Sequence, residues 1–78
     1  MPPTEQPEWV LTQRRAIGVH IRELRRAARL SQERLAELSG TDRQTINRIE
    51  QGHVATRIDT LLRIAAALDV TIADLVTT

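Results

Sequence analysis

Apolar residues recur at intervals of three and four along most of this chain, the spacing that places side chains on one face of an α-helix. Between residues 31 and 52, two short patterns of this kind lie on either side of Ser39 and Gly40. Ser31 and Thr41 are suited to cap two helices, and Gly40 can adopt the left-handed conformation that ends the first one. The pattern therefore predicts two short helices joined by a tight turn.

Three further helices are expected around this pair. The first would start at Thr12 as its cap, because apolar residues then follow in helical register at Ile17, Ile21, Leu24 and Ala28. After the pair, a helix is expected to begin with Thr56 as its start signal and to end at Asp69. A last short helix would follow Thr71, with Asp74 completing a capping pattern.

The amino-terminal residues 1–8 contain all three prolines and no apolar period, so a disordered leader is expected there. Residues 9–78 would then form one all-α domain of five helices. Gly18 within the first helix predicts the close approach of another helix. Trp9 at the domain edge is expected to dock on the domain's own core or on a partner subunit.

Charge is unevenly distributed, although the net charge of the 78 residues is only +1. The segment 14–48 holds nine arginines and four acidic residues, a net charge of +5, whereas both flanking segments are acidic. All eleven basic residues are arginines, which a GC-rich genome would explain as well as phosphate binding. The arginines at positions 14, 15, 26 and 29 could equally form a solvated helix face.

Composition and motifs exclude several classes of protein. No apolar run is long enough for a membrane span and no secretory signal is evident, so a cytoplasmic protein is expected. The chain has no cysteine, and His20 and His53 lack the acidic company of a metal site. We predict no catalytic site, metal or cofactor, and hence no enzyme.

The second helix of the pair is the candidate for reading DNA. Its exposed face would carry four long polar side chains, which are suited to paired contacts with base edges in the major groove: Arg43, Gln44, Asn47 and Arg48. Gln44 has an alternative role in a capping box with Thr41. Asp42 would repel phosphate, so it either caps the helix, accepts from a cytosine amino group or pairs with an arginine.

Phosphate contacts would set the position of the protein on the duplex without reading sequence. Candidates are the exposed start of a helix at Gln32 and the basic side chains of Arg34 and Arg57. His53 joins them if its loop lies on the DNA backbone.

Three blocks in order, IRELRRAARLSQERLA, SGTDRQTINRIEQG and IDTLLRIAAALDVTIADL, resemble the Xre/Cro/phage-repressor type of helix-turn-helix regulators. The resemblance spans about residues 17–76. It implies that the helix beginning near Thr41 enters the major groove, that Gln32 touches the backbone or supports that helix, and that Arg25 and Glu50 form a structural ion pair. Thr56-Arg57 departs from the family's frequent Pro-Ser, and Asp69 replaces its usual glycine.

The predicted function is a sequence-specific transcription regulator that binds double-stranded DNA as a homodimer on two half-sites. The C-terminal helix, with Ile72 or Val76, is the first candidate for the dimer surface, and Trp9 is the second. An antitoxin or other protein-interaction module, which uses the same fold to bind a protein partner, is the alternative. Restriction–modification controller, antitoxin, phage-type repressor and stand-alone regulator stay open as subtypes.

Overall fold

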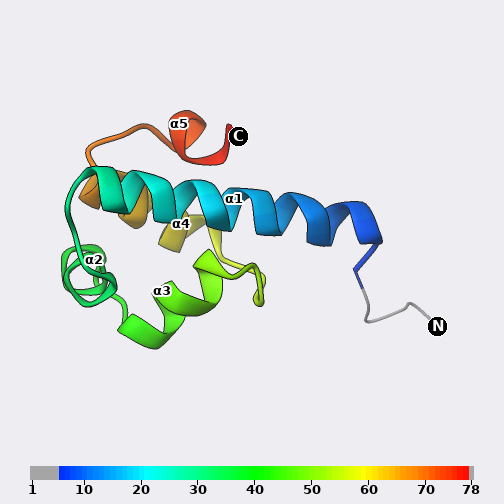
Figure 1. Ribbon diagram of the computed structural model, residues 1–78, viewed down its shortest axis with the longest axis horizontal. Helices are drawn as coiled ribbons and strands as arrows, with labels where there is room; N and C mark the ends of the chain where they lie inside the picture. The colour runs from blue at the N-terminus through cyan, green and yellow to red at the C-terminus, as the bar shows by residue number, and fades with distance from the viewer. Residues whose placement is uncertain (1–5, 78) are drawn as a thin grey trace.

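The computed structural model describes residues 6–77, which form five α-helices and no strand. The long first helix runs along the middle of the molecule, with the second and third on one side of it and the fifth on the other (Figure 1). The predicted all-α fold of five helices is confirmed. In chain order the helices are α1 (Glu8–Ala27), α2 (Gln32–Ser39), α3 (Arg43–Glu50), α4 (Ile58–Ala67) and α5 (Ile72–Val76).

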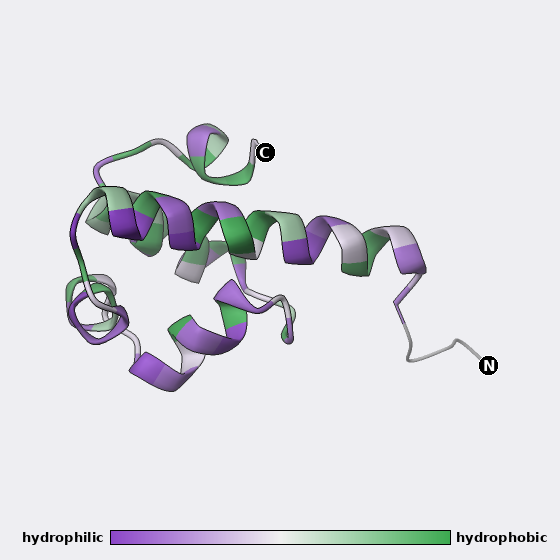
Figure 2. Cartoon of the chain, viewed as in Figure 1, coloured by the Kyte–Doolittle hydropathy of each residue, from purple (hydrophilic) through white to green (hydrophobic). Residues whose placement is uncertain are grey.

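All five helices contribute to a single core. The apolar stripes of α1 to α4 meet in it, and α5 contributes the buried side chain of Leu75. Figure 2 shows hydrophobic and hydrophilic segments alternating along the helices, with hydrophilic segments along much of α3. The core contains no aromatic side chain, so branched and small aliphatic residues fill it. They are Ile21, Leu35, Ala36, Ile46, Ile49, Ile64, Ala65, Leu68 and Leu75.

Left-handed residues close the first four helices. Gly40 and Gly52 both have φ of 71°, and they end α2 and α3. Arg29 and Asp69 adopt φ of 60° and 57° after α1 and α4, although a side chain makes this conformation costly by roughly 1–2 kcal/mol. The left-handed conformation predicted at Gly40 is confirmed. Asp69 adopts it where the resembling family has glycine, and the one at Arg29 carries no sequence signal.

Two of the predicted helix starts agree with the structure. The Ser31 hydroxyl accepts a hydrogen bond from the backbone N–H of Arg34 at 2.9 Å and caps α2. Thr71 and Asp74 form a reciprocal capping box at α5, with both side chain to backbone bonds present. In these two places the polar side chain that precedes the apolar pattern does satisfy a free N–H group.

Two other predicted starts are wrong. α1 begins at Glu8, four residues before Thr12, because nothing after Pro7 interrupts the helix and Glu8 interacts favourably with its amino-terminal dipole. Glu8 of the predicted leader is therefore helical, and residues 1–5 of that leader lie outside the described part of the chain. α4 is preceded by Arg57 rather than Thr56, and no side chain caps it.

Gly18 fixes how closely α1 approaches α3. A Cβ atom at this position would lie 2.5 Å from the carbonyl oxygen of Ile49 and 2.6 Å from that of Glu50, so only glycine permits the contact. The predicted close approach of a second helix at Gly18 is confirmed, and the second helix is α3. The carboxyl end of α3 is thereby held against the middle of α1.

Trp9 does not dock on the core, which was the first of its two expected places. Its side chain lies on the first turn of α1 and the residue is 69% exposed, at the edge of an apolar hollow of about 310 Å³.

None of the described helices is long and apolar enough to cross a membrane.

Candidate nucleic-acid interface

The two faces of α3 have opposite environments. Ile46, Ile49 and Glu50 are buried against the rest of the domain. Gln44 and Arg48 are exposed on the other side, and Arg43 is exposed at the start of the helix; none of the three makes a side-chain hydrogen bond or ion pair with any described residue. Three of the four predicted base-reading side chains therefore reach solvent with all their hydrogen-bonding groups free.

Asp42 is the cap of α3. Its carboxylate accepts a hydrogen bond from the backbone N–H of Thr45 at 2.8 Å and another from the Thr45 hydroxyl at 2.9 Å. These two bonds, with a smaller contribution from the nearby positive charge of Arg48, hold the pKa of Asp42 below its ordinary value. Of the three roles considered for Asp42, capping is the one seen in the free protein.

The predicted cap at Thr41 and its capping box with Gln44 are wrong. Asp42 has the extended backbone of a cap residue, and its carboxylate both accepts from the first turn and interacts favourably with the helix dipole. The helix starts one residue later than predicted, so Gln44 falls out of the position from which it could bond back to the cap. Gln44 is exposed and free of this competing role.

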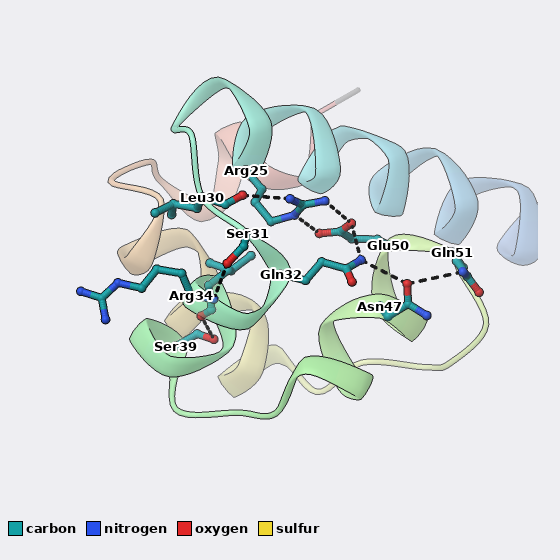
Figure 3. A network of polar contacts seen from close by, with 10 residues as sticks. Arg25, Leu30, Ser31, Gln32, Arg34, Ser39, Asn47, Glu50 and Gln51 are labelled. Atoms are coloured by element: carbon teal, nitrogen blue, oxygen red, sulfur yellow. Dashed lines mark hydrogen bonds and ion pairs between the residues drawn. The ribbon is translucent and has the colours of Figure 1, made fainter.

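A buried polar network fixes the inner side of α3 (Figure 3). The Arg25 guanidinium donates to both carboxylate oxygens of Glu50, at 2.7 and 3.0 Å, and also to the Leu30 carbonyl at 2.9 Å. The Arg25 and Glu50 side chains are only 9% and 2% exposed. The resemblance implied a structural ion pair between these two residues. The pair joins α1 to the carboxyl end of α3.

Gln32 links the start of α2 to the same network. Its amide nitrogen donates to Glu50 and to the side-chain oxygen of Asn47, both at 3.1 Å. The Asn47 oxygen also lies 3.5 Å from the amide nitrogen of Gln51. Asn47 is thus the one predicted reader that is engaged within the domain, and Gln32 supports α3 in the free protein.

The other three predicted phosphate-contacting residues are exposed, and no hydrogen bond or ion pair joins them to one another. Arg34 is exposed, extends away from the network in Figure 3 and lies 3.5 Å from Glu37 on its own helix. Arg57 is exposed beside Thr45 of α3, where both line a small hollow. His53 is exposed in the turn that follows α3.

An open groove of about 530 Å³ lies between α3, the start of α2 and the second half of α1. Arg43 and Asn47 line it from α3, and Gln32 lines it from α2. From α1 it receives Arg22 and Arg26, which were not among the predicted site residues. Their spacing of four residues was visible in the sequence, but the direction of that face of α1 was not.

The family model for helix-turn-helix proteins, HTH_3, matches residues 21–75. The fold is similar to that of the restriction–modification controller protein C.AhdI from Aeromonas hydrophila, with a TM-score of 0.81 and 38% identity over 83% of this chain and 94% of that one. No curated protein matches the chain.

Two other similar structures are also regulators by description. The clp gene regulator ClgR from Corynebacterium glutamicum has a TM-score of 0.78 and 25% identity, over 81% of this chain and 67% of that one. The hypothetical transcription factor NHTF from Neisseria has a TM-score of 0.80 and 27% identity, over 99% and 87%. The family model covers well over half of the sequence, and the chain therefore belongs to the HTH_3 family of Xre/Cro-type helix-turn-helix DNA-binding regulators.

Proposed function

We propose that this protein is a sequence-specific transcription regulator that reads the DNA major groove with α3. The observation that carries the proposal is the free outer face of α3, where Arg43, Gln44 and Arg48 are exposed on a helix whose inner face is buried. An arginine suits the paired acceptors of guanine, and a glutamine suits the donor and acceptor of adenine. Asn47 contributes at the edge of this face.

The fixed position of α3 supports the same role. A reading helix must present its side chains in one orientation, because base-edge contacts depend on paired hydrogen bonds with defined geometry. The Arg25–Glu50 pair and the close approach at Gly18 hold one end of α3, and the Asp42 cap fixes the other. Gln32, Arg34, Arg57 and His53 are the proposed contacts to phosphate.

We infer that two copies act together. An eight-residue helix is only about 12 Å long and spans few base pairs, so one copy offers little discrimination. Two reading helices separated by about 34 Å would meet successive turns of the major groove on a two-half-site operator.

The surface proposed to join the two copies contains exposed apolar residues on α4 and α5. Ile58 and Leu62 are 70% and 47% exposed and lie four residues apart, so they share one side of α4. Val76 on α5 is 39% exposed, whereas Ile72 packs partly against the core. Of the two residues predicted for a dimer surface on the C-terminal helix, Val76 is therefore retained. Trp9 remains the second candidate surface.

Among regulator subtypes, the similarity to C.AhdI favours a restriction–modification controller. The identity of 38% extends over 94% of that protein's chain.

Selection of bound sites from random double-stranded DNA tests the proposed function. The purified protein is expected to enrich a motif with two related half-sites, and sedimentation should give two chains per bound duplex. A protein-interaction module of this fold would enrich no motif. Recovery of a single half-site with one chain per duplex would retain DNA reading but overturn the dimer.

A charge on the proposed dimer surface separates the two candidate surfaces. Leu62→Asp should convert the dimer to a monomer at concentrations where Trp9→Ala has no effect, because a buried carboxylate opposes association. Circular dichroism should show unchanged helix content, since Leu62 is half exposed. Loss of the dimer in Trp9→Ala alone would move the interface to the start of α1.

A further inference from the structure

Two arginines on α1 face the groove beside the reading helix. Arg22 and Arg26 are four residues apart, so they share one side of α1, and both line the groove of about 530 Å³ that Arg43 and Asn47 line from α3. Arg25, between them in the sequence, is turned inward to Glu50. α1 thus forms one wall of the groove, and α3 forms another.

The charges in this groove are not balanced. Four arginines and two glutamates line it, and Glu50 is neutralised by its bond with Arg25. Arg22, Arg26 and Arg43 then face Glu33 alone, which leaves an excess of two positive charges. Within residues 6–77, no ion pair or side-chain hydrogen bond occupies any of these three arginines.

Arg22 makes no side-chain hydrogen bond with a described residue. Its Nε–H is covered by neighbouring atoms, so a ligand could bind only at the terminal groups of the guanidinium, where the partly exposed side chain lines the groove. A guanidinium in an open, positively charged groove is matched in charge and geometry by a phosphate.

We propose that Arg22 and Arg26 bind phosphates of the DNA backbone along the edge of the major groove that faces α1. The inference rests on the proposed function, because a duplex read by α3 has a backbone strand on each side of the reading helix. Arg22 and Arg26 lie on α1, beside α3 rather than on its outer face. They would therefore meet the backbone beside α3, whereas Arg43 belongs to the reading helix itself.

The salt dependence of DNA binding tests this assignment. The slope of log K against log salt concentration is negative. Each phosphate contact that is lost should reduce its magnitude by about 0.9, because fewer counterions are released. Arg22→Gln and Arg26→Gln should each reduce the magnitude of this slope. Each should also weaken binding by roughly 3- to 10-fold, equally on the selected site and on random duplex. Arg14→Gln removes the same charge from α1 outside the groove and should change neither value.

A charge-conserving variant separates binding from folding. Arg22→Lys keeps the positive charge and should retain most of the slope, and thermal melting should show that all variants are folded. If Arg22→Gln does not fold, Arg22→Lys and Arg26→Gln carry the test. If the wild type binds its site but Arg22→Gln and Arg26→Gln show the same slope as Arg14→Gln, the proposal is overturned and the proposed function is not. Failure of the wild type to bind any duplex would overturn the proposed function as well.

Discussion

The inner and outer faces of α3 differ in almost every physical respect, although they belong to the same eight residues. On the inner face, Glu50 is 4% exposed and all its hydrogen bonds are made within the domain. On the outer face, Arg43, Gln44 and Arg48 are exposed and none of them is paired with a described residue. The inner face holds α3 in place, and the outer face is available to a partner.

This difference shows how a small domain can present a rigid reading surface. The buried ion pair, the contact at Gly18 and the cap at Asp42 restrain α3 without using any of the three exposed side chains. Substitutions on the inner side should therefore lower stability, and those on the outer side should alter only recognition. The variants below separate these two effects, in decreasing order of their expected effect on stability.

Glu50→Ala should give the largest loss of stability. It leaves the Arg25 guanidinium buried without its counter-ion, and breaking such a pair typically costs about 3–5 kcal/mol of unfolding free energy. The measurement is urea unfolding followed by circular dichroism. In a domain of this size that loss could leave much of the protein unfolded at 37 °C.

The double variant Arg25→Met/Glu50→Leu is the matched control for Glu50→Ala. It removes both charges and retains apolar volume, so it should be more stable than either single variant that leaves one charge behind. A Glu50→Ala protein within about 1 kcal/mol of the wild type would contradict the view that this pair restrains α3.

Asp42→Ala should have a smaller effect that depends on pH. The folded pKa of Asp42 is lowered by its bonds to Thr45, so the ionised carboxylate stabilises the fold above its unfolded pKa. That contribution is lost as pH falls through the lower folded pKa. At neutral pH, loss of the cap should lower Tm by roughly 4–8 °C, and in acid the two proteins should converge.

Asp42→Asn tests whether the charge or the cap geometry matters. Asparagine also caps helices well, so this variant should melt near the wild type at neutral pH, without the part of the acid-range loss of stability that Asp42 contributes. A constant difference in Tm between Asp42→Ala and the wild type from neutral to acid pH would show that Asp42 is not the titrating cap.

Local patterns in the sequence were sufficient for the five helices, the turn at Gly40 and the approach at Gly18. Each depends on helical periodicity or on a backbone requirement that a residue type reveals directly. The starts of α1 and α4 were wrong because neither helix has a side-chain cap, and the start of α3 was wrong because two neighbouring residues can serve as its cap. At α3 the aspartate took this place from the adjacent threonine, Thr41.

Only the part of the site that lies on one face of one helix could be predicted from the sequence. Arg43, Gln44 and Arg48 follow from the spacing on one helix face. The engagement of Asn47 by Gln32 and the presence of Arg22 and Arg26 beside α3 depend on how three helices pack. No periodicity within α1 indicates which neighbour its arginines face.

The central claim, that the outer face of α3 reads bases, is tested most directly by Arg43→Ala. The measurement is the ratio of affinities for the selected site and for the same site changed at one base pair, with unfolding measured in parallel. Loss of a paired arginine contact, worth about 1–3 kcal/mol, should lower this ratio by about 5- to 150-fold at the base pair that Arg43 reads, while stability stays unchanged. Arg14→Ala should leave the ratio as it is. An Arg43→Ala protein that keeps the full ratio at every position of the site would contradict the claim.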